Sequence, residues 1–120
     1  MMNIEKKLVE ILAVILGVDE EMITSDAQVT DDLGAESIDF VDLTYQLEKN
    51  FDIDKVEITD IYPEAMYGEF SEENLKSMVE ENPYLEKNLM KIMMEQKNYS
   101  IIGSVYAIQE FIQWKIGNAE

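Results

Sequence analysis

Residues 31–43 read Asp-Asp-Leu-Gly-Ala-Glu-Ser-Ile-Asp-Phe-Val-Asp-Leu, and the pattern of the chain changes in the middle of this run. Up to Glu36 the residues are mostly polar or small, whereas apolar residues recur with helical spacing after Ser37. Asp39 and Asp42 fall in the first turns of that pattern, where negative charge suits the helix dipole. We therefore predict a helix over residues 37–50 that begins at Ser37.

This predicted helix has two apolar stripes. One is typical of a buried face and consists of Phe40, Leu43, Leu47 and Phe51. The other consists of Ile38, Val41 and Tyr45, and it runs beside the acidic positions 39, 42 and 48. The acidic residues alone would suggest an ordinary solvated helix face. Apolar side chains fringed by carboxylates, however, are what a transient protein-docking face presents.

Towards the N-terminus, residues 3–17 carry another clear helical pattern. Its apolar positions are Ile4, Leu8, Ile11, Leu12 and Ile15, and Gly17 is a natural helix end. Residues 18–36 are polar with few apolar residues, which predicts a long ordered loop. Ordered loops of this length are uncommon and usually functional, so the loop favours a site at the start of the next helix.

Beyond Phe51 two further helical patterns precede the C-terminal one. Ser71 begins the first, and Pro83 ends it and opens the second, which continues to Gln96. A last helix is expected over residues 104–116, with Gly117 as its end. We find no convincing β-strand alternation. We therefore predict an all-α fold in a single domain over residues 1–120, a length that suffices for one hydrophobic core.

The composition limits the chemistry of the chain. It has 26 acidic and 9 basic residues, no cysteine, no histidine and a formal net charge of −17. Without cysteine or histidine, Ser/His/Asp and Cys/His catalysis are impossible, and the common zinc and haem sites lose their usual ligands. We therefore expect a protein that is not an enzyme and has no metal site.

The strong negative charge also indicates the partners. It should repel nucleic acid and anionic lipid, and it should speed the encounter with proteins that carry basic patches. No apolar run is long enough to span a membrane, and acidic residues interrupt the apolar N-terminal segment. We expect a cytoplasmic monomer that neither inserts into membranes nor binds nucleic acid.

The run from Asp31 to Asp39 resembles the signature of the acyl carrier protein family, whose common form reads D-L-G-A-D-S-L-D. Glu36 and Ile38 replace Asp and Leu of that form and preserve charge or apolar character. The resemblance continues backwards through residues 16–18 and forwards through residues 41–51, and it resumes at residues 104–112. A match that keeps its order over several elements is far more specific than one short pattern.

The resemblance implies an acyl-carrier-like helical bundle and a covalent cofactor. In this family a separate phosphopantetheinyl transferase esterifies the signature serine with 4'-phosphopantetheine from coenzyme A, and the matching residue here is Ser37. The arm carries acyl thioesters between enzymes of fatty-acid, lipid or polyketide biosynthesis. The helix after the serine docks on basic patches of acyltransferases, ketosynthases or acyl-(acyl carrier protein) synthetases. The residues implied for docking are Glu36, Ile38, Asp39, Val41, Asp42, Tyr45 and Glu48.

The chain departs from the family between the second long helix and the last one. Family members usually have a short loop and a small third helix there, whereas this chain has a longer segment, about residues 54–102, here called the insertion. Its periodicity predicts one or two added helices. It contains Met66, Met78, Met90, Met93 and Met94. These methionines either fill the core between the added helices or enlarge a pocket for an unusual acyl chain, and a partner-specific surface is a third hypothesis.

Two other classes of protein are alternatives. Carriers of amino acids or peptides share the helical fold and the modified serine, and sequence separates them poorly from acyl carriers. An acidic calcium-binding protein is suggested by the alternation of Asn50, Asp52 and Asp54. Lys55 and Ile61, however, stand where an EF-hand loop requires glycine and glutamate, so we discount the calcium interpretation.

Overall fold

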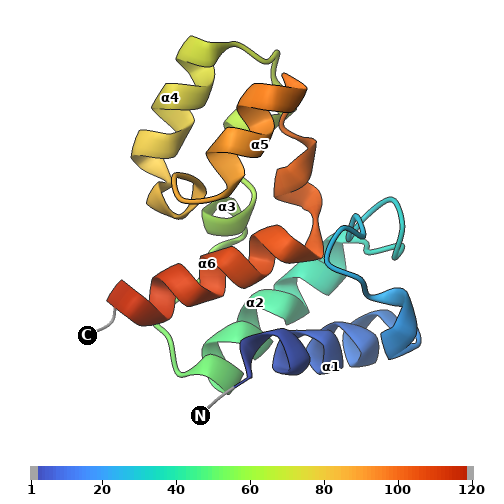
Figure 1. The fold of residues 1–120 in the computed structure, drawn as a ribbon. Helices are drawn as coiled ribbons and strands as arrows, with labels where there is room; N and C mark the ends of the chain where they lie inside the picture. The colour runs from blue at the N-terminus through green and yellow to red at the C-terminus, as the bar shows by residue number, and fades with distance from the viewer. Residues whose placement is uncertain (1–2, 119–120) are drawn as a thin grey trace.

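The computed structural model describes residues 3–118, and the fold within that range is all-α, as predicted. Three long helices form a bundle: α1 (Ile4–Leu16), α2 (Ser37–Phe51) and α6 (Val105–Asn118). Figure 1 shows α6 between α1 on one side and the shorter helices α4 and α5 on the other. Residues 3–118 contain no β-strand, and their single isolated β-bridge joins Gln28 to Ser104.

Local sequence explains both ends of α1. The Asn3 side chain accepts a hydrogen bond from the Lys6 amide (3.0 Å), which satisfies one of the unpaired donors of the first turn. Gly17 closes the helix with a φ of +66°, a conformation that glycine adopts without steric cost. The helix buries Leu8, Ile11 and Leu12, which belong to the apolar stripe of the sequence.

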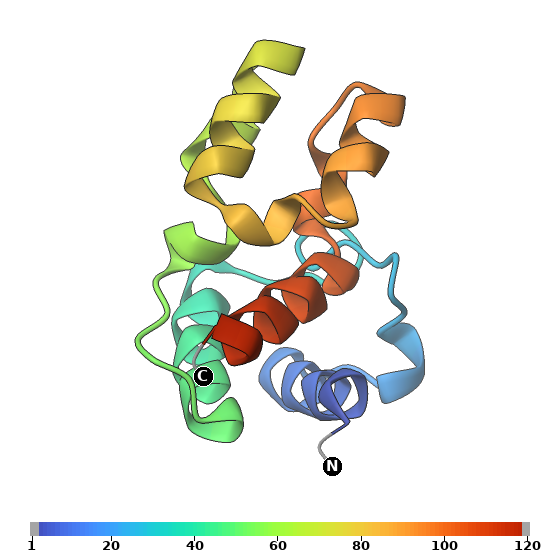
Figure 2. The ribbon, with the colours of Figure 1, turned by 60° about the vertical axis from the view of Figure 1, so that its left-hand side comes forward.

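The insertion consists of short helices joined by 3-10 turns. The helices are α3 (Ile58–Ile61), α4 (Glu72–Glu81) and α5 (Leu89–Gln96), and the turns are η2 (Glu64–Tyr67), η3 (Pro83–Leu85) and η4 (Ser100–Gly103). The two added helices of the prediction are therefore α4 and α5. Figure 2 shows them as two arms that diverge from η3, which lies against α6.

Caps and prolines set the boundaries within the insertion. The Ser71 hydroxyl accepts a hydrogen bond from the Asn74 amide (3.0 Å) and caps α4. Pro83 follows the end of α4 and begins η3 rather than α5 itself, since the chain makes a 3-10 turn before α5 starts at Leu89. Proline suits this place because the first residue of a helical turn has no acceptor for an N–H group.

The last helix starts as expected and extends further than expected. The Ser104 hydroxyl accepts a hydrogen bond from the Ala107 amide (3.2 Å) at the start of α6. The helix then continues through Gly117 to Asn118, two residues beyond the expected end at residue 116. Glycine costs a helix only about 1 kcal/mol relative to alanine, so a single glycine does not oblige a helix to stop.

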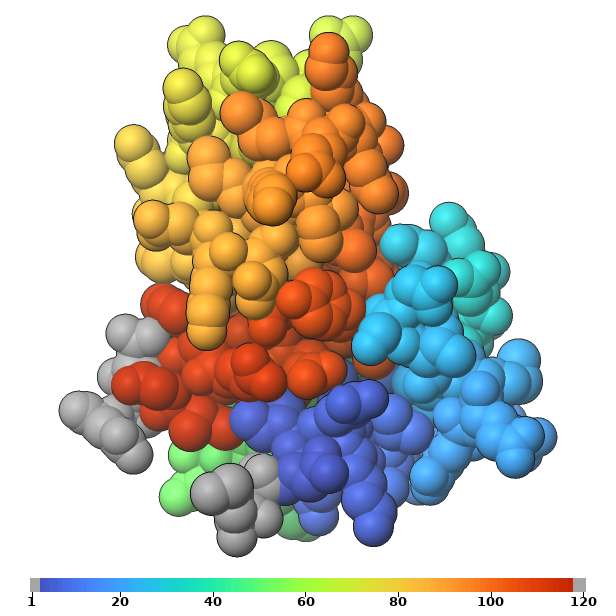
Figure 3. Space-filling view, in the orientation of Figure 1, coloured from blue at the N-terminus to red at the C-terminus, as the bar shows by residue number. Residues whose placement is uncertain are grey.

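One continuous hydrophobic core joins the bundle to the insertion. Completely buried side chains come from both parts. Those of the bundle include Leu8, Leu12, Leu47, Ile108 and Ile112, and those of the insertion include Leu75, Met78, Leu85, Leu89 and Met93. Tyr84 of η3 packs edge-to-face on Phe111 of α6, with 5.3 Å between the ring centroids. Figure 3 shows the surface of α6 enclosed between the insertion and α1.

The methionines of the insertion are packing residues. Met78 and Met93 are completely buried, and Met66, Met90 and Met94 are half-buried against the same core. Unbranched thioether side chains fill irregular gaps between helices. The arrangement therefore favours the core-filling hypothesis over an enlarged acyl pocket.

Candidate functional site

The loop before α2 is tied to the start of α6 by backbone hydrogen bonds. Val29 N donates to Gly103 O (2.9 Å), and Val105 N donates to Ala27 O (3.0 Å). A Cβ atom on Gly103 would collide with the side-chain amide oxygen of Gln28, so a larger residue at this position would oblige that flexible side chain to move. These contacts hold the polar loop of the sequence in one conformation ahead of α2.

The last turn of the loop depends on Gly34. Its φ of +77° lies in the left-handed region, where other residues are strained. Leu33 and Ala35 on either side are buried and anchor the turn, whereas Glu36 is exposed. The turn thus brings the chain back to the surface just before α2.

The helix start at Ser37 agrees with the sequence prediction. Glu36 N donates to Asp39 Oδ2 (2.8 Å), and Asp39 N donates to Glu36 O (2.9 Å). Asp39 therefore caps the first turn of α2 in addition to carrying surface charge. A capped first turn holds Ser37 in a defined position at the helix start.

The Ser37 side chain is exposed, and its hydroxyl has no hydrogen bond to any residue in the described range 3–118. Backbone N–H groups in the first turn of a helix have no acceptor four residues earlier, and the helix dipole favours negative charge there. A phosphate ester on this hydroxyl would stay in water and would bury no charge. The position therefore fits the phosphodiester of a 4'-phosphopantetheine arm.

The second apolar stripe of α2 lies on the surface. Ile38, Val41 and Tyr45 are 74%, 61% and 57% exposed, and the Lys49 ammonium lies 6.0 Å from the centroid of the Tyr45 ring. Large apolar side chains that face solvent together on one helix are characteristic of an interaction surface. The structure thus brings the three predicted apolar docking residues onto one exposed face.

The four acidic residues predicted for docking have different environments. Glu36 and Asp42 are exposed, whereas Asp39 is half-buried in its cap. Glu48 is also half-buried, and its Oε2 accepts a hydrogen bond from Val56 N (2.7 Å), which ties the start of the insertion to α2. The exposed carboxylates available to a partner are therefore those of Glu36 and Asp42.

Sequence reasoning missed Val14 of α1, which is 84% exposed. It lines a groove of about 240 Å³ between α1 and α2, together with Asp42 and Gln46 of α2. The sequence did contain a signal for this exposure. Val14 falls outside the apolar stripe of α1, so its side chain must point away from the face that this stripe buries. The groove extends the apolar surface beside α2 onto a second helix.

Sequence reasoning also missed Tyr62. It is 8% exposed, packs edge-to-face on Phe40 with 5.2 Å between the ring centroids, and its hydroxyl has no hydrogen-bond partner among the described residues. Burial raises the pKa of the Tyr62 hydroxyl far above its usual range, and nearby Tyr67 adds to the effect. Phe40 is half-buried and lies one turn after Ser37, so its contact with the buried Tyr62 ring supports the first part of α2. No periodic signal marked Tyr62, because it follows a helix of only four residues.

Two features are absent from residues 3–118: a metal-binding cluster and a membrane-spanning helix. No group of three acidic side chains in this range is arranged to hold a metal ion. The residues that suggested an EF-hand end α2 instead, because Asn50 Nδ2 donates to Gln46 O (2.8 Å) and Asp52 closes the helix with a φ of +51°. None of the helices in this range is both long and apolar enough to cross a bilayer.

A comparison with protein families matches the chain to the family described as "Phosphopantetheine attachment site". It covers residues 6–65, which are 60 of the 120 residues. The matched range contains α2 with Ser37 at its start, and it also contains α3, so the first part of the insertion lies within it. The added helices α4 and α5 lie outside it.

Two curated relatives carry the name "Acyl carrier protein". The relative from Syntrophobacter fumaroxidans is 54% identical over 48 residues, which are 40% of this chain and 59% of the relative. The relative from Akkermansia muciniphila is 44% identical over 52 residues, which are 43% of this chain and 65% of the relative. The chain thus covers less than two thirds of the length of either. No solved structure gives a significant match. The family match over half of the chain establishes that the chain belongs to the phosphopantetheine-attachment family, and the two relatives show its similarity to acyl carrier proteins.

Proposed function

We propose that this protein carries acyl groups as thioesters on a 4'-phosphopantetheine arm attached to Ser37. One observation supports the proposal most strongly. Ser37 is exposed at the first position of α2, inside the range that matches the phosphopantetheine attachment family. The attached arm would supply a thiol, which the cysteine-free chain lacks, and its tether would raise the effective concentration of the cargo at a partner's active site.

The contribution of this chain to attachment is to present the hydroxyl. The Ser37 oxygen forms the new bond to phosphorus, while the adenosine-containing part of coenzyme A leaves. The serine proton passes to a base of the phosphopantetheinyl transferase, because this chain has no histidine and Ser37 has no internal hydrogen bond within the described residues. The Gly34 turn and the Asp39 cap keep the hydroxyl at the surface.

The exposed face of α2 would dock partner proteins. Ile38, Val41 and Tyr45 supply apolar contact, and Glu36 and Asp42 supply free negative charge beside it. We expect the partners to be the phosphopantetheinyl transferase and basic-patch acyltransferases, ketosynthases or acyl-(acyl carrier protein) synthetases. Asp39 and Glu48 belong to the predicted docking set as well, and they combine that role with their hydrogen bonds to backbone amides.

The attachment proposal is tested by intact mass spectrometry. The protein is incubated with coenzyme A and a phosphopantetheinyl transferase, and the mass gain is measured for the wild type and for Ser37→Ala. We expect one phosphopantetheinyl adduct in the wild type and none in the variant. Ser77→Ala removes another exposed helical serine and should leave the adduct unchanged. An adduct that persists in Ser37→Ala would refute the assignment of Ser37.

The docking proposal is tested through the ionic-strength dependence of the association rate with the transferase. Raising salt should slow association, because screening weakens long-range attraction. Asp42→Asn should slow it at low salt, whereas Asp54→Asn removes the same charge from an exposed position outside α2 and should have less effect. Equal effects of the two substitutions would indicate that net charge alone controls the encounter. The monomeric state, the cytoplasmic location and the choice among fatty-acid, lipid and polyketide synthesis stay predictions.

A further inference from the structure

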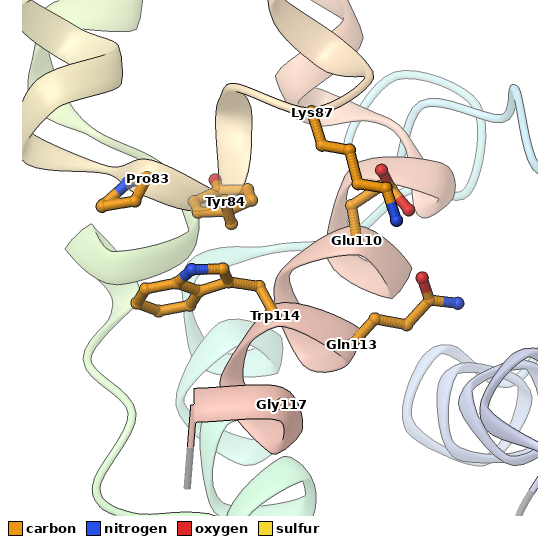
Figure 4. Close-up of a pocket in the computed structure, with 7 residues that line it drawn as sticks. All are labelled: Pro83, Tyr84, Lys87, Glu110, Gln113, Trp114 and Gly117. Atoms are coloured by element: carbon orange, nitrogen blue, oxygen red, sulfur yellow. The ribbon is translucent and has the colours of Figure 1, made fainter. Parts of the chain in front are cut away.

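A cavity of about 300 Å³ lies between the insertion and the last helix, and no residue of α2 lines it. Figure 4 shows Pro83, Tyr84 and Lys87 on the side of η3, and Glu110 and Trp114 on α6. One wall therefore comes from the insertion and the other from the bundle. All of these residues lie beyond residue 65, outside the range that matches the attachment family.

Glu110 makes this cavity electrostatically unusual. It is 8% exposed, and it is the only charged side chain in the buried core of the described residues. Asn88 Nδ2 donates a hydrogen bond to Glu110 Oε1 (2.6 Å), but none of the lysines described in residues 3–118 forms an ion pair with it. The pKa of nearby Tyr106 is raised, by burial first and by the Glu110 charge second. A buried carboxylate without a cation is unfavourable, so the cavity favours a positively charged occupant.

Aromatic rings form the opposite side of the cavity. Tyr84 is held rigidly, because its hydroxyl donates to Ile61 O (2.6 Å) and its ring packs on Phe111. The indole of Trp114 is half-buried on α6 and lies below Pro83 and Tyr84 in Figure 4. Aromatic faces attract cations, and the planar guanidinium group both stacks on such faces and pairs with a carboxylate through two parallel hydrogen bonds. A guanidinium fits this combination better than an ammonium does.

Lys87 is the one cationic residue among those of residues 3–118 that line the cavity. Its side chain is exposed, so water and salt screen its charge, whereas the charge of Glu110 is much less screened. The field inside the cavity is therefore dominated by the carboxylate. Lys87 acts as a weak competitor for that carboxylate.

We propose that this cavity binds an arginine side chain of a partner protein. The net charge of −17 selects partners with basic surfaces, and this chain contains no arginine of its own. The cavity has room for one side chain and is too small for a helix. Glu110 and Trp114 thus form an anchor site beside the insertion, with the buried Tyr84 as part of its wall, and this site is separate from the docking face on α2 and independent of Ser37.

The test uses the fluorescence of Trp114, the only tryptophan in the chain. The full chain is titrated with N-acetyl-arginine amide, which imitates an arginine within a protein. We expect a saturable change in emission. The ligand concentration at half of this change, the midpoint, should be on the order of millimolar, because a ligand of so few atoms binds weakly. N-acetyl-citrulline amide has nearly the same shape without the charge and should give no saturable change.

Two variants test the role of the carboxylate. Glu110→Gln keeps the size of the side chain and should raise the midpoint roughly tenfold or more, because a charge-assisted pair is lost. Glu95→Gln removes one charge from an exposed position on α5 and should leave the midpoint unchanged. Circular dichroism verifies that each variant is folded.

A third variant keeps the proposal testable if Glu110→Gln does not fold. Lys87→Gln removes the exposed competitor and should lower the midpoint, since only repulsion of the ligand is lost. Weaker binding by Lys87→Gln, an equal response to the citrulline compound, or unchanged binding by a folded Glu110→Gln would each overturn the proposal. Tighter binding of free arginine than of its amide would overturn the choice of a protein-borne side chain.

Ser37→Ala should titrate like the wild type, so this proposal and the carrier proposal succeed or fail separately.

Discussion

The bundle and the insertion treat their large apolar side chains differently. In the bundle, Val14 of α1 and Ile38, Val41 and Tyr45 of α2 are all more than half exposed. In the insertion, α4 and α5 turn their apolar faces inward, and the exposed large apolar residues, Ile58 and Tyr67, lie outside these two helices. The bundle thus leaves apolar surface exposed beside Ser37, whereas the added helices use theirs to extend the core.

The largest expected effect is on the free energy of unfolding, and it tests whether the bundle and the insertion share one core. Leu47→Ala in α2 and Leu89→Ala in α5 remove the same atoms from completely buried positions. Each should lower the free energy of unfolding by about 2–5 kcal/mol, because it leaves a cavity in the core. Chemical denaturation followed by circular dichroism and Trp114 fluorescence should give one transition for both. A separate transition for Leu89→Ala would show that the insertion unfolds on its own.

The second prediction compares two buried tyrosines of the insertion, Tyr84 in η3 and Tyr62 after α3. Tyr84→Phe removes the hydrogen bond to Ile61 O and should lower the free energy of unfolding by about 1–2 kcal/mol. Tyr62→Phe removes a buried hydroxyl without a partner and should raise it by about 1 kcal/mol. Urea denaturation measures both. A loss of stability in Tyr62→Phe would mean that its hydroxyl makes a favourable interaction.

The same tyrosines predict a loss of stability at alkaline pH. Burial is the main cause that raises the pKa of both hydroxyls above the value of about 10 found in unfolded chains. The folded state thus holds these protons more tightly than the unfolded state, so the stabilisation is complete below about pH 10 and decreases above it. The double variant Tyr62→Phe/Tyr84→Phe should show a smaller decrease between pH 8 and pH 11. A decrease as large as in the wild type would assign the effect to other groups.

Two valine-to-serine substitutions, one at an exposed position and one at a buried position, test the contrast between exposed and buried apolar residues. Val41→Ser on the exposed stripe should change the free energy of unfolding by less than about 0.5 kcal/mol while slowing modification by the transferase. Val79→Ser, at a position 8% exposed in α4, should destabilise the protein clearly, because it buries a hydroxyl among apolar groups. If the transferase modified Val41→Ser as fast as the wild type, the exposed stripe would not be part of the docking surface.

The smallest effect is expected at the start of the insertion. Lys55 and Glu57 form an ion pair of 3.1 Å, but their side chains are 81% and 58% exposed. Lys55→Gln should therefore change the free energy of unfolding by less than about 0.5 kcal/mol, and added salt should reduce the change further. A larger effect in a thermal melt would indicate that this pair helps to hold the insertion on the bundle.

Much of the fold and part of the site could be predicted from local signals. Asn3, Ser71 and Ser104 each accept a hydrogen bond from an amide three residues later at the start of a helix, and polar residues in such places are recognisable in a sequence. The start of α2 at Ser37 follows from the same kind of signal. Gly117 misled the prediction of the end of α6, since packing on neighbouring turns tolerates a glycine that propensity disfavours.

The sequence by itself determined the helical class, the excess negative charge, the position of Ser37 and the exposed stripe that follows it. Caps, periodicity and composition carry this information because each depends on residues close together in the chain. Only the tertiary structure decided that Glu110 is buried beside a cavity, that Glu48 binds the Val56 amide and that the Tyr62 hydroxyl has no partner among the described residues. Burial and pairing of this kind depend on which surfaces meet when distant segments pack, and no local pattern records that meeting.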